Sequence, residues 1–396
     1  MTVLDRFLNY VSFETTAGEE KPDRCSDEKM LLLADSLMQE LFRLHPDSIS
    51  INRFGVIDCH FKGDENKKAV AFLAHMDTSP QASGKNVRAR VVKYEGQDIV
   101  LSEGRVLSEK EFPHLRNAVG HPIVVTDGTT LLGGDDKAGI AIIMTALTDI
   151  LKKEGHRPIE VIFTTDEEIG ADAEHVSMEL CSSEYGYTVD GGDYRLIAIE
   201  SFTAYAMDVH VIGKSIHPGS AKNKLVNASE VLMRFHEALP HALRPEHTEG
   251  KEPFYHLCSI HGSEDSATGE YIIRSFSEDQ MKSLIELARF TARRINEELG
   301  YPAISLKIRE QYHNMKNVLD KYPAIQKEME SVYEKLGIDY EYEAIRGGTT
   351  GSQLSFKGLP CPNIGTGDYN CHGQYEYVDV FEMERMVDVV RELMIG

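Results

Sequence analysis

Cysteine is scarce in this chain, and the few residues of this type are scattered. The six cysteines are Cys25, Cys59, Cys181, Cys258, Cys361 and Cys371. None belongs to a Cys-x-x-Cys pair, which argues against a thiolate zinc site and against a disulfide framework. This spacing is typical of a protein from a reducing compartment.

The sequence also lacks long apolar runs and an excess of positive charge. No segment is apolar for long enough to span a bilayer, and residues 1–9 lack the apolar core of a signal peptide. The formal net charge is −22, which argues against nucleic acid or an anionic membrane as partner because their phosphates would be repelled. We therefore expect a cytoplasmic protein without nucleic-acid or membrane partners.

The 396 residues suffice for two or three domains with large cores. Apolar periodicity predicts helices at residues 2–11, 27–44, 140–153, 322–336 and 380–394. It predicts two short strands within residues 49–61 and further strands at 69–74, 158–165 and 362–365. Asp27 is expected to cap the second of these helices. We find no internal repeat and no low-complexity tract.

The pattern changes near residue 205, where a second domain is predicted. Strands are expected at residues 206–212, 255–261, 269–276 and 303–309, with helices at 227–239 and 277–299. Their order, β-α-β-β-α-β, is that of the ferredoxin-like split motif. We therefore predict a domain at 206–311 that is inserted into a first domain formed by 1–205 and 312–396.

The predicted strand at residues 69–74 ends in His75-Met-Asp77. Alternate side chains of a strand share a face, so His75 and Asp77 can point into one pocket at the strand's end, where sites form in open α/β sheets. Imidazole suits zinc, and a nearby carboxylate can orient the ring. Taken alone, the tripeptide favours a core histidine bonded to an aspartate, but the motifs that follow favour a metal site.

Asp135 and Asp136 lie in the glycine-rich stretch Leu-Leu-Gly-Gly-Asp-Asp-Lys-Ala-Gly, directly before the helix expected at 140–153. Glycines let a backbone turn sharply and approach a ligand closely. The two aspartates are either an N-cap pair for this helix or a metal site in which one of them bridges two cations.

Three adjacent carboxylates follow the strand expected at 158–165, in Asp166-Glu167-Glu168. Such neighbours repel one another, and two cations in the same pocket would relieve the repulsion. One glutamate could bind metal while its neighbour acts as a general base.

Four more residues are candidates for the same site. Asp190 precedes two glycines, and His372 lies in a loop at 367–373. The alternative interpretation of Asp190 is an ordinary turn residue. Within the inserted domain, His217 precedes Pro-Gly and Arg274 lies near the end of a strand. Their alternatives are a turn residue and a surface charge.

These side chains fit a co-catalytic dinuclear zinc site, with one bridging carboxylate and one histidine plus one carboxylate for each metal. Carboxylates combined with imidazoles would also admit manganese or cobalt. The candidate ligands are His75, Asp135, Glu167 or Glu168, Asp190 and His372.

The chain resembles the aminotripeptidase, or peptidase T, branch of the dinuclear zinc peptidases, a family that also includes aminoacylase, carboxypeptidase G and succinyl-diaminopimelate desuccinylase. The similarity runs nearly end to end, from residues 6–12 to 372–376. The strongest matches include His75-Met-Asp-Thr-Ser-Pro80, Thr130-Leu-Leu-Gly-Gly-Asp-Asp-Lys-Ala-Gly139, Asp166-Glu-Glu168, Tyr187-Thr-Val-Asp-Gly-Gly192, His217-Pro-Gly219, Tyr271-Ile-Ile-Arg274, Arg346-Gly-Gly-Thr349 and Tyr369-Asn-Cys-His-Gly373. The resemblance implies a catalytic α/β domain with a mixed central sheet flanked by helices, and an inserted ferredoxin-like lid domain.

The resemblance also implies which residues would hold two zinc ions per subunit. His75 and Asp190 would hold one ion, and Glu168 and His372 the other. Asp135 would bridge them, and the peptide bond between Asp135 and Asp136 resembles one that is cis in relatives.

The remaining roles follow from the same resemblance. Asp77 would orient His75. Glu167 would be the general base, which takes a proton from the bridging water and later gives one to the leaving amine. His217 would hydrogen-bond the oxyanion. It would act in its own subunit or, as in some relatives, in the site of a partner subunit, so the sequence is compatible with a homodimer. Arg274 would pair with the substrate's carboxylate, and Arg346 would also contact the substrate.

Several positions depart from the pattern of the relatives. Thr350 stands where they carry aspartate in Arg-Gly-Gly-Thr-Asp-Gly, and Asp368 stands where they carry glycine. Thr203 replaces an asparagine, and Ser275 and Ser277 follow Arg274 in place of aspartates. All lie close in sequence to the substrate-handling motifs.

The sequence therefore predicts a metal-dependent aminopeptidase that releases the first residue of short peptides, most of all tripeptides. A dinuclear zinc dipeptidase or an N-acyl-amino-acid amidohydrolase is the alternative, since the departures could change recognition of the free amine. A non-catalytic binding protein on the same fold is disfavoured, because Glu167 and every expected ligand are present.

Overall fold

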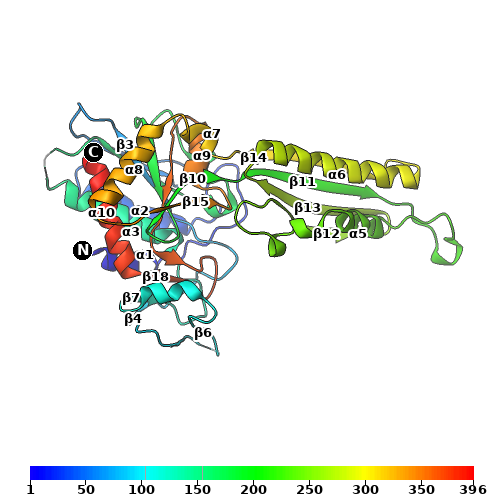
Figure 1. The fold of residues 1–396 in the computed structure, drawn as a ribbon, viewed down its shortest axis with the longest axis horizontal. Coiled ribbons are helices and arrows are strands. Elements are labelled where there is room, and N and C mark those ends of the chain that lie inside the picture. The colour runs from blue at the N-terminus through cyan, green and yellow to red at the C-terminus, as the bar shows by residue number, and fades with distance from the viewer. Residues whose placement is uncertain (103, 154) are drawn as a thin grey trace. The chain divides into compact units, whose positions relative to one another are not determined.

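The computed structural model describes residues 1–102, 104–153 and 155–396, and the chain divides into two compact units (Figure 1). The first consists of Met1–Ile199, Val318–Glu343 and Thr349–Gly396, and the second of Glu200–Asn317 and Ala344–Gly348. The second unit thus begins at Glu200, earlier than the residue 206 expected from the sequence. None of the helices in the described ranges is long and apolar enough to cross a membrane.

The first unit is built on an eight-stranded mixed sheet with the spatial order β1-β2-β8-β3-β9-β16-β10-β15. Its strands are β1 (Ser48–Ile51), β2 (Ile57–Phe61), β3 (Val70–His75), β8 (Ile159–Thr164), β9 (Tyr185–Val189), β10 (Leu196–Ser201), β15 (Glu341–Ile345) and β16 (Asn363–Ile364). β3 runs parallel to β8 and β9, whereas β2 pairs antiparallel with β8. The mixed α/β sheet agrees with the expected fold class.

Helices cover both faces of this sheet. Side chains on one face form a core with α1 (Val3–Tyr10), α2 (Met30–Phe42), α3 (Gly134–Ile150), α8 (Pro323–Lys335) and α10 (Val380–Ile395). The opposite face packs with α4 (Asp172–His175) and α9 (Thr350–Phe356). On β3 the two cores alternate, because Phe72 belongs to the first and Leu73 to the second. Burial on both faces explains why β3 and β8 are mostly apolar. The exceptions are the strand ends, His75 and Thr164, and the buried Glu160.

A smaller sheet in the same unit holds the loop that carries His372. Its order is β17-β18-β7-β4, formed by β17 (Asp368–Tyr369), β18 (Tyr377–Asp379), β7 (Pro122–Val125) and β4 (Arg90–Lys93), beside a two-stranded sheet of β5 (Ile99–Val100) and β6 (Val106–Leu107). The loop with His372 joins β17 to β18, which pair antiparallel.

The second unit contains a four-stranded antiparallel sheet with the order β12-β13-β11-β14. Its elements are β11 (Thr203–Ile212), α5 (Ala228–Ala238), β12 (Phe254–Gly262), β13 (Ser266–Ser275), α6 (Glu278–Leu299) and β14 (Ile304–Tyr312), and α7 (Lys316–Leu319) follows. Both long helices pack on one core with alternate residues of β11. The connection and strand order are those of the expected ferredoxin-like motif.

Two local expectations were wrong. The helix expected from residue 27 begins at Met30, and Asp27 instead accepts the N–H of Lys29 at 2.9 Å in the preceding turn. The helix expected at 140–153 begins at Gly134, with Asp135 and Asp136 in non-helical conformations inside its first turn.

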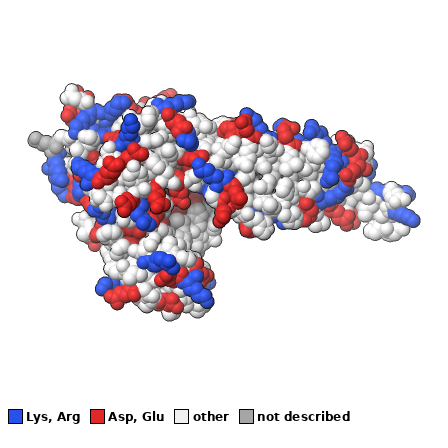
Figure 2. Space-filling model, viewed as in Figure 1, with Lys and Arg blue, Asp and Glu red and all other residues white. Residues whose placement is uncertain are grey.

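Acidic and basic side chains are interspersed over the face of the molecule seen in Figure 2. The excess of acidic residues is therefore spread over that face and not collected into one patch on it.

Candidate metal and catalytic site

Asp135 lies between two histidines that come from distant parts of the chain. His75, the last residue of β3, places its Nε2 2.9 Å from Asp135 Oδ1. His372 places its Nε2 3.0 Å from Asp135 Oδ2. One carboxylate thus presents a separate oxygen to each imidazole, which is the arrangement of a bridging ligand between two cations.

Each histidine also has a carboxylate of its own. Glu168 Oε2 lies 3.1 Å from His372 Nε2, and Asp190 Oδ1 lies 3.8 Å from His75 Nε2. Asp190 follows β9, the parallel neighbour of β3, so both side chains emerge at the same edge of the sheet. The five residues therefore form two overlapping groups that share Asp135.

Glu167 and Glu168 follow β8 in a short 3₁₀ turn, η2 (Glu167–Ile169). Glu167 Oε2 is 4.0 Å from His75 Nε2, farther than Glu168 is from His372. Glu167 therefore faces the same pocket without belonging to the tight contacts around Asp135.

Asp77 holds this part of the site in place. Its backbone carbonyl lies 3.0 Å from His75 Nδ1, and its carboxylate Oδ1 lies 3.6 Å from the same nitrogen. The carboxylate also accepts the N–H groups of Glu167 at 3.2 Å and of Glu168 at 3.1 Å. Asp77 is fully buried, so this one residue fixes the imidazole mainly through its carbonyl and the pair of glutamates through its carboxylate.

The sequence left open whether Asp135 and Asp136 cap a helix or bind metal, and the structure gives the two residues different surroundings. Asp136 Oδ1 accepts the N–H of Gly139 at 3.2 Å, as a helix cap does, and its Oδ2 accepts the N–H of His75 at 3.2 Å. Asp135 instead faces the histidines. The peptide bond between the two is cis, as the resemblance implies. Gly139 has to be glycine because a β-carbon there would overlap the carbonyl oxygen of Val189.

Glu376 supports the turn that presents Asp135. Its carboxylate accepts four backbone N–H groups, at distances of 2.6 Å from Leu132, 2.9 Å from Gly133, 2.6 Å from Gly134 and 3.2 Å from Asp135. A carboxylate that accepts several N–H groups fixes the backbone around it. Sequence reasoning assigned no role to Glu376, although it ends the last matched motif.

The electrostatics of the pocket are those of crowded, buried carboxylates. Burial and the neighbouring Asp135 raise the pKa of Asp190 to about 7. Burial raises the pKa of Glu167 well above its usual value, with His75 opposing the rise and Asp172 adding to it. Hydrogen bonds to Asp135 and Glu168 raise the pKa of His372 to about 11.

These side chains fit a pair of divalent cations. Glu168 Oε1 is buried and has no hydrogen-bond partner among the described residues, so this carboxylate oxygen has electron pairs left for a cation. Nitrogen and oxygen donors from two histidines and three carboxylates suit zinc, manganese and cobalt. Four carboxylates, those of Asp135, Glu167, Glu168 and Asp190, converge there beside two histidines. Bound cations would stabilise their ionised forms.

Thr350, one of the positions expected to depart from the relatives, contacts a buried carboxylate. Thr350 Oγ1 donates a hydrogen bond to Asp172 Oδ2, and Asp172 is fully buried with no partner for Oδ1 among the described residues. Burial raises the pKa of Asp172 to about 6. Sequence reasoning missed Asp172, because its partner lies 178 residues away.

The second departure from the relatives, Asp368, is also buried. Its Oδ2 accepts a hydrogen bond from Cys371 Sγ at 2.9 Å, and burial raises its pKa well above its usual value. Asp368 therefore lies next to the loop of His372 and not at the surface.

The three other predicted residues belong to the second unit. His217 Nδ1 accepts the N–H of Gly219 at 3.1 Å, which leaves the ring proton on Nε2 and makes that nitrogen a donor. Arg274 donates from Nη1 to the carbonyls of Tyr205 and Ile273 and to Gln311 Oε1, at 3.1–3.3 Å.

Arg346 is held by the second unit's own backbone. Its Nη1 donates to the carbonyls of Gly250 at 2.6 Å and Glu252 at 3.1 Å, and its guanidinium lies 5.2 Å from the ring centre of Phe202. Most of its donors are thus engaged in joining 344–348 to the rest of the unit.

Comparison with known proteins gives a consistent family. Residues 127–395 match the model of peptidase family M20/M25/M40. A peptidase T of Shouchella clausii is 43% identical over 98% of this chain and 96% of its own length. A peptidase T of Bacillus velezensis is 41% identical over 99% of this chain and 97% of its own length.

Solved structures share the fold at lower identity. A tripeptidase from Staphylococcus aureus superposes with a TM-score of 0.78 at 20% identity, covering 99% of this chain and 97% of its own. A dinuclear metal binding peptidase of the M20 family from Bacillus subtilis gives a TM-score of 0.66 at 14% identity, covering 99% and 98%.

Proposed function

Because this chain belongs to peptidase family M20/M25/M40, we propose that it is a metal-dependent aminopeptidase that cleaves the first peptide bond of short peptides, most of all tripeptides. The observation that carries this proposal is Asp135, whose two oxygens lie 2.9 Å and 3.0 Å from two different histidines. Relatives of similar length named peptidase T support the substrate class.

The ligands that we propose for two zinc ions are the residues around Asp135. His75 and Asp190 would hold one ion, Glu168 and His372 the other, and Asp135 both. When bound, the cations would polarise the scissile carbonyl and lower the pKa of the attacking water. Manganese or cobalt could take the same donors.

Glu167 is the proposed general base. It reaches the pocket without tight contact to either histidine, and its raised pKa suits a group that accepts a proton from water and passes it to the leaving amine. Asp77, which receives the N–H groups of both glutamates, keeps Glu167 in register with the ligands.

The second unit is proposed to act as a lid that holds the substrate. His217, a donor at Nε2, would stabilise the oxyanion, and Arg274 would pair with the substrate's carboxylate. Arg346 is given a supporting role, because its guanidinium is bonded to backbone carbonyls.

Removal of metal tests the proposed chemistry. We expect a strong chelator to abolish hydrolysis of a free tripeptide, and zinc, manganese or cobalt to restore it. Hydrolysis that persists in the chelated protein, with metal content measured as zero, would contradict the mechanism.

Substrate preference is tested with free and N-acetylated di- and tripeptides. Cleavage of the free tripeptides supports an aminopeptidase. Cleavage of blocked substrates alone would instead identify an N-acyl-amino-acid amidohydrolase, and preference for dipeptides a dipeptidase. These outcomes all keep the metals and differ only in how the substrate's ends are recognised.

A further inference from the structure

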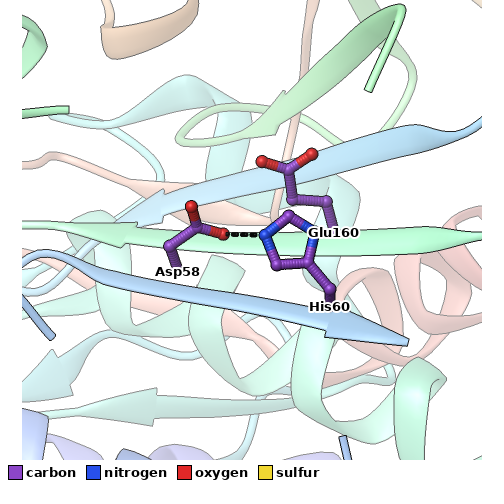
Figure 3. A group of neighbouring side chains, drawn as sticks. All are labelled: Asp58, His60 and Glu160. Atoms are coloured by element: carbon purple, nitrogen blue, oxygen red, sulfur yellow. Dashed lines mark ion pairs between the residues drawn. The ribbon is translucent and has the colours of Figure 1, made fainter. Parts of the chain in front are cut away.

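A second group of metal-binding side chains lies on β2 and β8, away from the site described above. Asp58 and His60 are alternate residues of β2, and His60 pairs directly with Glu160 on the antiparallel β8. Alternate residues of a strand share a face, so the three side chains project together from one face of the central sheet. Figure 3 shows Asp58 directed at the ring of His60, with the side chain of Glu160 on the neighbouring strand next to the ring.

Their spacing is that of ligands around one ion. One donor atom from each residue lies within 4.8 Å of the other two. His60 Nε2 and Asp58 Oδ1 are 2.9 Å apart, but Oδ1 has no hydrogen-bond partner of good geometry among the described residues. Two ligands about 2.0 Å from a tetrahedral zinc ion lie about 3.3 Å apart, so small shifts would seat a cation between them.

The burial of Glu160 is a second reason, besides the spacing, to expect a cation here. Glu160 is 1% exposed, and its Oε2 accepts the N–H groups of Ser182 at 3.0 Å and Ser183 at 2.9 Å. Its Oε1 is buried and has no partner among the described residues. An unpartnered carboxylate oxygen in the interior is costly unless a cation meets it.

The charge of the group is also incomplete. Asp58 and His60 form an ion pair with each other. No lysine or arginine within the described ranges forms an ion pair with either of them or with Glu160. Even a protonated His60 would neutralise only one of the two carboxylates. A divalent cation bound to a neutral imidazole and two carboxylates would bring the net charge to zero.

The group is accessible and separate from the proposed catalytic metals. His60 and Glu160 line a pocket of about 410 Å³ together with Ser182 and Ser183, through which an ion can enter. Glu160 is near the start of β8, whereas Glu167 follows its end. At about 3.3 Å per strand residue, the length of β8 from Glu160 onward alone separates them by about 13 Å.

We propose that Asp58, His60 and Glu160 form a third cation site, which binds zinc or a chemically similar divalent ion such as manganese or cobalt. One imidazole with two carboxylates is a donor set that these metals share. The ion would fasten β2 to β8 and, through Glu160, to the segment of Ser182 and Ser183. This site does not depend on the proposed peptidase activity, because none of its residues reaches the catalytic pocket.

The direct test is a zinc-soaked crystal of the full chain, read for anomalous scattering at the zinc edge. We expect a peak among Asp58, His60 and Glu160, apart from any peaks next to Asp135. Absence of that peak, in a crystal that holds zinc next to Asp135, overturns the proposal.

Metal counting in solution gives a second test. Chelator-stripped protein is titrated with zinc chloride at mildly alkaline pH, since Asp58 raises the pKa of His60 and a proton would compete with the metal. We expect His60→Gln and Glu160→Gln each to bind one ion fewer than the unsubstituted chain, or to bind it at least tenfold more weakly. His241→Gln, which removes a histidine from an exposed histidine–glutamate pair, is the matched control and should bind the full number.

Peptidase activity separates local loss of metal from damage to the fold. We expect His60→Gln to keep its activity, because the catalytic residues are untouched. Equal zinc stoichiometry and affinity in the unsubstituted chain and both variants would overturn the proposal, whatever the activity. If His60→Gln lost activity and misfolded, Glu160→Gln, which keeps the side-chain volume and the serine contacts, and the anomalous map would decide.

Discussion

At the scale of single residues, two neighbouring glutamates have different surroundings. Glu168 Oε2 lies 3.1 Å from His372 Nε2, whereas Glu167 has only a 4.0 Å approach to His75 Nε2. Both receive their backbone position from Asp77. A ligand needs the first environment and a proton acceptor the second, so adjacent positions in the sequence can serve separate tasks.

Glu167→Gln is predicted to keep the metal and lose turnover. A positioned general base contributes about 10²–10⁴-fold to rate, so kcat should fall by at least about a hundredfold. Metal content measured by atomic emission should be unchanged. Glu174→Gln, an exposed residue of α4, is the control. Full turnover in Glu167→Gln would remove this residue as the base.

Asp172→Asn is predicted to shift the pH dependence of catalysis. The negative charge of Asp172 contributes to the raised pKa of Glu167, so its removal stabilises the ionised base. The acid limb of kcat/KM should therefore move to lower pH, as measured from a pH–rate profile.

The control moves the carboxylate from Asp172 to Thr350, two residues whose side chains are hydrogen-bonded to each other. Thr350→Asp alone would place two buried carboxylates in contact and should lower the Tm. The double variant Asp172→Asn with Thr350→Asp restores one carboxylate to the pair and should recover most of that loss. A double variant no better than the Thr350→Asp single variant would contradict a direct pairing of these two side chains.

Sequence reasoning was strongest for residues within continuous motifs. It placed His75, Asp135, Glu168 and His372 in one set, and the structure brings those side chains together. It could not find Asp172 or Glu160, because a contact between residues far apart in the chain leaves no local pattern. An acidic residue in an apolar strand, as at Glu160, is the one signal that could have been used.

At the scale of elements, the turn before α3 is stabilised by a residue from the other end of the chain. Glu376 accepts all four backbone N–H groups of residues 132–135. The turn itself contains two glycines and cannot hold its shape through side-chain packing. The position of Asp135 therefore depends on Glu376.

Glu376→Gln is predicted to weaken both stability and metal binding. Hydrogen bonds to a charged group contribute about 1.5–3 kcal/mol, and an amide accepts them less well and presents its own N–H groups to the same donors. We expect a loss of about 2–3 kcal/mol in the free energy of unfolding, and weaker zinc binding.

Chemical denaturation and zinc titration measure these two quantities. Glu384→Gln, an exposed position of α10, should change neither. Unaltered zinc affinity in Glu376→Gln would show that the turn keeps its shape without the carboxylate.

Long apolar or amphipathic elements were predicted well, and short exposed ones were not. β3 and β8 are buried throughout, so their apolar runs are unambiguous. β4 and β7 escaped prediction because each is only four residues long. β4 is also mostly exposed, and neither strand shows the alternation that identifies a half-buried strand. The early start of α3 was missed because its first turn is non-helical at two residues.

At the scale of the whole molecule, the sequence predicted two units and the ferredoxin-like order of the second. The boundaries were less accurate, because the second unit also takes in 344–348. That short segment is tied to the unit by Arg346, a tertiary contact that no periodic pattern announces.

The metal-free protein is predicted to lose stability as the pH rises. Burial raises the pKa of Asp190 to about 7 and that of Glu382 to about 8, so between about pH 4.5 and 7 the folded chain keeps protons that the unfolded chain has released. His372, with a pKa raised to about 11, acts in the same direction above about pH 6.5. The two carboxyl groups and the imidazole therefore all make the free energy of unfolding fall with rising pH.

Thermal unfolding of chelator-treated protein measures this dependence. We expect a higher Tm near pH 5.5 than near pH 7.5, and zinc should raise the Tm most at the higher pH because it replaces the missing protons. A Tm of the metal-free chain that rises across this range would contradict the assignment.

The dependence of the Asp135 turn on Glu376 has a consequence for biosynthesis. The bonded positions are 241–244 residues apart, so a growing polypeptide makes the turn long before its support exists. His372 emerges from the ribosome equally late. Until these late residues have emerged, Asp135 lacks both its supported turn and the imidazole of His372, so the proposed pair of cations cannot be bound.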